Sequence, residues 1–160
     1  DDRGQEGLSL RSIPGGLLAQ ERDTHPFSAS DLRQAAGPEA DDALRQAAGL
    51  PWAVVKLLKS NAICIATPER LLGAGAGQMD RVAACRLAVT KAGDLTDVQG
   101  PVIAASDAFF PFPDGPQILI DAGVTCLIHP GGSKRDDETF ALCEEHGITC
   151  LLTGIRHFRH

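Results

Sequence analysis

The sequence predicts an α/β fold, a three-layer α/β/α sandwich built around one mixed sheet. Two short apolar runs joined by a turn are typical of a β-hairpin. After them, helical patterns alternate with short buried-strand patterns up to the C-terminus. The length of 160 residues and the 43% hydrophobic content suit one compact domain with a substantial core.

The N-terminal third is predicted to hold an extended segment and a broken helix. We expect residues 1–9 to be a flexible lead-in, because they are polar and contain glycine, and residues 10–160 to form the single domain. Residues 8–23 are predicted to be extended and to end in the charged turn Glu21-Arg22-Asp23. Residues 38–59 follow a helical pattern that Gly49-Leu50-Pro51 divides in two.

The remaining elements start with the hairpin, whose apolar runs at 62–66 and 71–73 flank the turn Thr67-Pro68-Glu69-Arg70. The pattern then predicts, in order, helix 80–92, strand 102–105, helix 114–122, strand 124–128, helix 136–146 and strand 148–152. A hairpin followed by repeated α-β units is the topology of the cytidine-deaminase-like fold.

Composition and charge exclude several classes of function. The net charge of −6 argues against a nucleic-acid or anionic-membrane surface, since both partners are polyanions. The five cysteines lie mostly in apolar runs and form no C-x-x-C pair, so we expect no metal site and a cytoplasmic protein with reduced thiols. No apolar stretch approaches the roughly 18 residues of a membrane helix.

Several motifs allow a ligand-binding and a purely structural interpretation. The glycine-rich segment 73–78 is either a ligand contact or a tight turn, and it does not match a dinucleotide fingerprint. Asn61 is at a strand start, where a cap or turn is the simpler explanation. Arg81 is able to hold a carboxylate or phosphate, although a surface ion pair is the commoner role of such an arginine.

Three loops carry further candidate residues. Residues 106–115 concentrate three phenylalanines between Asp107 and Asp114, a composition that favours a slot for a flat heterocycle over core packing alone. Residues 129–136 suit either an anion site or ordinary helix capping by Ser133 or Asp136. The basic terminus 156–160 follows an apolar strand, so Arg156 is either part of a solvated tail or available to a phosphate.

One absent pattern is informative. Zinc deaminases of the cytidine-deaminase-like fold need H-x-E and P-C-x-x-C to hold the metal and supply the acid-base glutamate. Neither motif occurs in these 160 residues, and a zinc-dependent deaminase is therefore excluded.

Taken together, several segments resemble the bacterial AICAR transformylase family, the transformylase half of PurH-type bifunctional enzymes of purine biosynthesis. The matching segments, in the family's order and approximate spacing, are residues 59–63, 73–79 with 81–82, 105–112, 130–133 and 156–160. Residues 11–23 are similar to the family's R-S-x-x-G-G-x-L-x-Q-D-R-D segment. The resemblance covers nearly the whole chain from about Leu8 onward.

The resemblance implies transfer of a formyl group from the cosubstrate 10-formyltetrahydrofolate to the 5-amine of AICAR ribotide, without a metal. By motif, Asn61 and Phe109 are expected to contact the AICAR base and Arg156 its phosphate. The residues expected on the folate side are Arg81, Val82, Asp114 and Gly115. Asn61 and His160 are the expected catalytic residues.

The sequence also departs from the family pattern. The family's Lys-His pair, which is the usual candidate for proton transfer, does not occur here, nor does the cyclohydrolase domain. Pro113 replaces an arginine beside Asp114, and Asp80 stands where a serine is usual. We therefore expect a homodimer or a partner chain that carries the missing subdomain. The alternative is a non-catalytic module that binds ribotides or folates.

Overall fold

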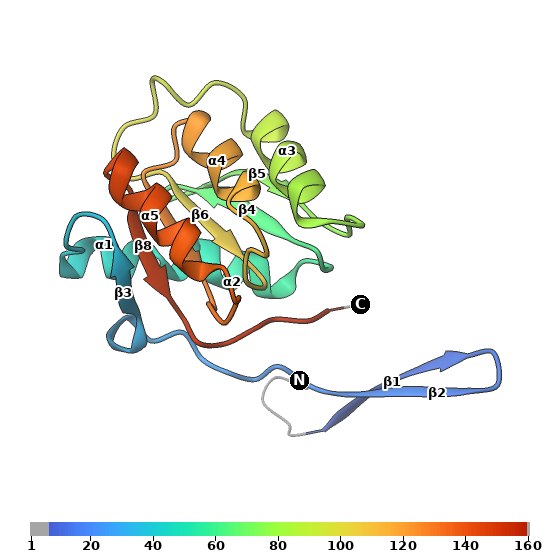
Figure 1. The fold of residues 1–160 in the computed structure, drawn as a ribbon. Helices are drawn as coiled ribbons and strands as arrows, with labels where there is room; N and C mark the ends of the chain where they lie inside the picture. Colours follow the sequence, from blue (N-terminus) through green and yellow to red (C-terminus); the bar gives the residue numbers. More distant parts are fainter. Residues whose placement is uncertain (1–6, 160) are drawn as a thin grey trace.

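The structure is a computed structural model that describes residues 7–159. Its centre is a mixed sheet of six strands (Figure 1), in which β6, β7 and β8 are parallel and the other three strands are antiparallel to their neighbours. In spatial order the strands are β3 (Arg33–Ala36), β8 (Thr149–Leu152), β7 (Cys126–His129), β6 (Ile103–Ser106), β4 (Ile63–Ala66) and β5 (Leu71–Gly75).

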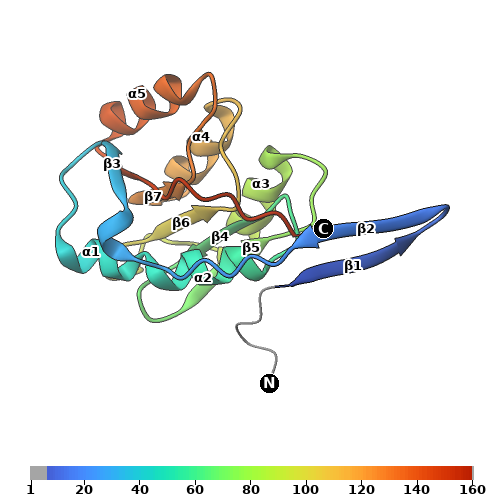
Figure 2. The ribbon, with the colours of Figure 1, turned by 90° about the horizontal axis from the view of Figure 1, so that it is seen from below.

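Helices cover both faces of this sheet (Figure 2). One face carries α3 (Arg81–Ala92), α4 (Asp114–Asp121) and α5 (Asp136–His146). The opposite face carries α1 (Asp42–Ala47) and α2 (Gly49–Leu57), with the short 3-10 helix η1 (Ala29–Asp31) before β3. Each face has its own apolar core, and the predicted α/β sandwich of three layers with a mixed sheet is confirmed.

Local sequence explains where the helices start and stop. The Asp80 side chain accepts a hydrogen bond of 2.7 Å from the Ala83 amide, which caps the first turn of α3. Asp41 caps α1 in the same way, through the Leu44 amide at 2.8 Å. Gly147 ends α5 in the left-handed region, with φ of 64°.

Two elements near the N-terminus differ from the sequence prediction. The extended segment 8–23 is a hairpin of two strands, β1 (Leu8–Ile13) and β2 (Gly16–Glu21), joined at Pro14-Gly15. A proline followed by a glycine at φ of 83° suits a tight turn. β1 already includes Leu8 and Ser9, whereas residues 1–6 of the expected lead-in lie outside the described residues. Strand β3 was not predicted at all.

The hairpin extends away from the body of the molecule (Figures 1 and 2). Every residue of its two strands is exposed. Large apolar side chains are among them, with Leu10 62% and Leu17 65% exposed. Large exposed apolar side chains are unusual on a two-stranded hairpin, because such hairpins are only marginally stable in water.

The glycine-rich segment mainly serves packing between β5 and α3. A Cβ atom at Gly73 would lie 2.3 Å from the Ala88 carbonyl oxygen, and one at Gly75 would lie 2.1 Å from that of Ala84. Only glycine allows the strand to approach the helix backbone so closely. Packing against α3 therefore explains Gly73 and Gly75. Neither a ligand contact nor a tight turn, the two interpretations of residues 73–78, is needed to explain them.

Candidate active site

The predicted site residues gather at one edge of the sheet. β4 is antiparallel to β5 and β6, and Ile63 lies opposite both Gly75 and Ser106. The start of β4 therefore lies beside the ends of β5 and β6, and parallel pairing brings the ends of β7 and β8 to the same edge. The segments that enter or leave the strands at this edge carry the predicted site residues. These are Asn61, Arg81, Val82, Phe109, Asp114, Gly115 and Arg156.

Arg81 connects Asn61 to Asp107 at this edge. Its guanidinium donates to Asn61 Oδ1 at 2.9 Å and to the Ala62 carbonyl at 3.2 Å, and it forms an ion pair with Asp107. Asn61 Nδ2 donates in turn to the Gln78 carbonyl at 3.0 Å. Both polar ends of the Asn61 amide are engaged, and its orientation is therefore set by the protein.

The Arg81–Asp107 ion pair is buried. Arg81 is 7% exposed and Asp107 is 0% exposed, and neither Arg81 Nε nor Asp107 Oδ2 has a hydrogen-bond partner among residues 7–159. Each charge is stabilised in this position by the other, since an unpaired buried charge is costly. Arg81 is thus a structural support of Asn61. The expected folate contact of Arg81, and that of its half-buried neighbour Val82, remain predictions.

The C-terminal tail lies beside the loop that carries Asn61. The amide of His157 donates to the Asp107 carbonyl at 2.8 Å. The Ser60 amide donates to the Arg159 carbonyl at 2.9 Å, and the Arg159 amide donates to Ser60 Oγ at 3.2 Å. The tail is ordered rather than freely solvated, and it holds the exposed side chain of Arg156 next to the ring of Phe158, 5.3 Å from its centroid.

The aromatic loop after β6 divides its side chains between the core and the surface. Phe110 is fully buried, Phe109 is half-buried and Phe112 is exposed. Asp107, at the start of the loop, is committed to Arg81 and is not available to read the amines of a heterocycle. Phe109 is therefore the phenylalanine of this loop that lies at the boundary between core and solvent.

Asp114 and Gly115 begin α4 at the same edge. The exposed Asp114 carboxylate accepts a hydrogen bond of 2.8 Å from the Gly115 amide. A Cβ atom at Gly115 would lie 3.2 Å from Phe110 Cδ1 and 3.3 Å from Cys85 Sγ. Close packing thus accounts for the glycine, and the folate contacts expected of both residues remain predictions.

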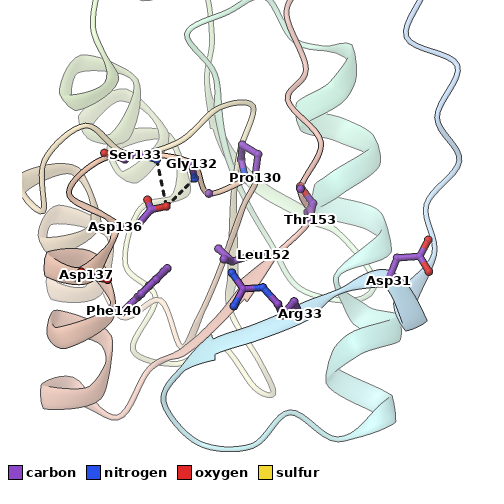
Figure 3. Close-up of a pocket in the computed structure, with 12 residues that line it drawn as sticks. Asp31, Arg33, Pro130, Gly132, Ser133, Asp136, Asp137, Phe140, Leu152 and Thr153 are labelled. Atoms are coloured by element: carbon purple, nitrogen blue, oxygen red, sulfur yellow. Dashed lines mark hydrogen bonds between the residues drawn. The ribbon is translucent and has the colours of Figure 1, made fainter.

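The loop after β7 uses its amides internally. Asp136 Oδ2 accepts hydrogen bonds from the amides of Gly132 at 2.7 Å and Ser133 at 3.2 Å (Figure 3). The predicted helix capping by Ser133 or Asp136 is not observed, because the N-cap residue of α5 is Arg135 and no side chain caps its first turn. The amides of Gly132 and Ser133 are instead engaged by Asp136. A cavity of about 410 Å³ adjoins the loop, and Arg33 and Phe140 are among the residues that line it.

His129 is the buried last residue of β7, and the sequence did not predict its contacts. Its Nδ1 accepts a hydrogen bond of 3.1 Å from the Gly131 amide, and its Nε2 lies 3.5 Å from Cys150 Sγ. Burial lowers the pKa of His129 from 6.5 to about 4, so its ring is neutral near pH 7.

Sequence reasoning also missed the contacts that hold the site residues in place. Asp107 and Arg81 are 26 residues apart, and their pairing depends on the antiparallel arrangement of β4, β5 and β6. The available signal was a charged residue, Asp107, directly after the mainly apolar run of β6. The other predicted catalytic residue, His160, lies outside the described residues.

Among residues 7–159, no group of three or more His, Cys, Asp or Glu side chains is placed to hold a metal ion. Within the same residues, no helix combines the length and the apolar character required to cross a membrane.

Comparison with known proteins gives a consistent result. Residues 1–91 match the family model described as AICARFT/IMPCHase bienzyme. The chain is 48% identical over 158 residues to the bifunctional purine biosynthesis protein PurH of Chloroflexus aurantiacus, covering 98% of this chain and 31% of that protein. It is 45% identical over 157 residues to the PurH of Cutibacterium acnes, covering 96% of this chain and 30% of that protein.

The chain thus spans less than a third of the length of these curated relatives. The family model nevertheless matches more than half of the chain. On this ground, the chain belongs to the AICARFT/IMPCHase bienzyme family.

Proposed function

We propose that this chain forms one side of the active site of an AICAR formyltransferase of purine biosynthesis. The reaction transfers a formyl group from 10-formyltetrahydrofolate to the 5-amine of AICAR ribotide. The observation that carries the proposal is the edge of the sheet where the oriented amide of Asn61, the half-buried Phe109 and the exposed Arg156 come from three separate segments. Membership of the family supports it.

The reaction requires a polar site, because the AICAR amine is a poor nucleophile whose lone pair is delocalised toward the carboxamide. The amine must be oriented and deprotonated, and the oxyanion of the tetrahedral intermediate must be stabilised. In the proposal, Asn61 and Phe109 orient the base, and the Arg156 guanidinium binds the phosphate with charge-assisted hydrogen bonds.

The folate side is proposed at the start of α3 and of α4. The half-buried Val82 is proposed to offer an apolar contact and Asp114 an exposed carboxylate, while the buried Gly115 is proposed to allow the close packing that shapes this side. His160, which lies outside the described residues, is proposed as a further catalytic residue near the folate. Pro113 brings no charge and no backbone donor to this side, in contrast to the arginine of the family pattern.

Three further features of the proposal concern the fold, the association and the cellular compartment of the whole protein. The order of elements supports a cytidine-deaminase-like fold. The exposed apolar hairpin supports a homodimer or a partner chain. The five buried, unpaired cysteines support a reducing compartment such as the cytoplasm.

Proton transfer is proposed to depend on a Lys-His pair from outside these 160 residues, since the chain contains no Lys-His dipeptide. That absence is also the observation that favours the second candidate, a module that binds ribotides or folates without catalysis.

A formyl-transfer assay distinguishes the two candidates. The chain is mixed with a separately produced family segment that carries the Lys-His pair, and formation of the formylated ribotide is followed with 10-formyltetrahydrofolate present. Turnover that requires both polypeptides and that decreases with Asn61→Ala supports the enzyme. Ribotide binding without turnover in any mixture supports the binding module and contradicts the enzyme.

A further inference from the structure

A side-chain contact connects the segment after the N-terminal hairpin to the C-terminal tail, and it holds one residue of the tail in the interior of the protein. His157 Nδ1 lies 2.5 Å from Asp23 Oδ2, and Asp23 belongs to the strap between the hairpin and η1. The histidine is 3% exposed, whereas its neighbours Arg156 and Phe158 are exposed. The tail thus turns one ring inward and leaves the guanidinium of Arg156 on the surface.

The inward pocket for His157 is built from α2. The edge of the histidine ring meets the Trp52 ring, with centroids 4.7 Å apart at an angle of 84°. The Lys56 ammonium lies 3.3 Å from Asp23 Oδ1 and 5.0 Å from the Trp52 centroid. Asp23 therefore bridges His157 of the tail and Lys56 of the helix.

The charges of this cluster are mutually stabilising. Burial alone would raise the pKa of Asp23, but the hydrogen bond and charge of His157, together with Lys56, outweigh burial and lower it. Near pH 7 the carboxylate is charged, and it is held between two donors that come from different elements.

We propose that Asp23 is a positioning residue that acts through His157 to place Arg156 for phosphate binding. The inference rests on the proposed function, in which Arg156 binds the phosphate of the ribotide. The backbone bonds of the tail to Asp107 and Ser60 fix its path, and the Asp23–His157 contact fixes which side chain of the tail faces inward. Without that contact, rotation of the tail moves Arg156 away from the site.

The test compares two ligands that differ by the phosphate alone. Calorimetric titrations of the full chain with AICAR ribotide and with the phosphate-free riboside are made for the wild type, Asp23→Ala and Arg156→Ala. Asp23→Ala is expected to weaken ribotide binding about tenfold while riboside binding stays the same. In the Arg156→Ala background, Asp23→Ala is expected to cause no further loss.

A matched control is Asp97→Ala, which removes an exposed aspartate of the loop before β6 and should leave both affinities unchanged. Equal weakening of ribotide and riboside by Asp23→Ala, or no weakening of either, overturns the inference while leaving the proposed function intact. A wild type that binds neither ligand contradicts the proposed function instead.

Hydrogen exchange tests the positioning step without any ligand. In Asp23→Ala, the backbone amides of residues 157–159 should exchange faster than in the wild type, whereas those of β7 should not change. Unchanged exchange at residues 157–159 overturns the inference even if no ligand binds.

Discussion

At the scale of single residues, the sequence singled out candidate side chains but not the contacts that hold them. Asn61, Phe109 and Arg156 were singled out from short motifs, and all three lie at the same edge of the sheet. The supports of Asn61, namely Arg81 and the Gln78 carbonyl, come from another segment. Such supports depend on strand pairing, which a local pattern does not specify.

His129 makes stability depend on pH. Its pKa is about 4 in the folded protein, below the ordinary 6.5, so between these values the unfolded chain binds a proton that the folded chain does not. The free energy of unfolding should therefore fall as pH decreases from about 6.5 to 4. Urea unfolding followed at several pH values measures this slope.

The matched variant is His129→Asn, which keeps an acceptor for the Gly131 amide without a titrating ring. Its unfolding free energy should vary less with pH across the same window. An identical pH slope in wild type and variant would show that other groups cause the acid sensitivity.

At the scale of elements, buried strands and capped helices were predictable, and short or exposed elements were not. All four residues of β4, β6, β7 and β8 are buried, and each strand has at least three consecutive apolar residues in the sequence. β3 has the sequence Arg-Gln-Ala-Ala, with little strand propensity, and pairs with β8 across an irregular register. Tertiary pairing, not local preference, makes it a strand.

The close approach of β5 to α3 gives a prediction for Gly75. In Gly75→Ala the new methyl group would overlap the Ala84 carbonyl, and we expect a loss of about 1–3 kcal/mol in unfolding free energy. Gly16→Ala is the control, because a Cβ atom there meets nothing within 4 Å. Chemical denaturation of both variants gives the comparison, and equal stability of Gly75→Ala and wild type would mean that the strand is not packed this closely.

At the scale of the whole molecule, the layered body was predicted and the projecting hairpin was not. The register of the hairpin places Leu8, Leu10 and Leu17 on one of its faces and Leu18 on the other. The described body of the protein leaves both faces exposed. Alternation of apolar and polar residues normally reveals one buried face, and a ribbon with apolar residues on both faces gives no such signal.

This hairpin predicts self-association. Sedimentation of the wild type should show dimers that form with increasing concentration, and the double variant Leu10→Ser, Leu17→Ser should shift the equilibrium toward monomers. Met79→Ser, which removes another exposed apolar side chain outside the hairpin, should behave as the wild type. A wild type that stays monomeric at all concentrations would contradict self-association. The apolar surface of the hairpin would then be expected to contact a different chain.

We propose that this chain carries the ribotide face of a formyltransferase site. Calorimetric titration of the full chain with AICAR ribotide, repeated with Arg156→Ala, tests it most directly. We expect binding by the wild type and an affinity about ten- to a hundredfold lower in the variant, the usual effect of losing a charge-assisted hydrogen bond. Absence of binding by the wild type, or equal affinities of the two proteins, would contradict it.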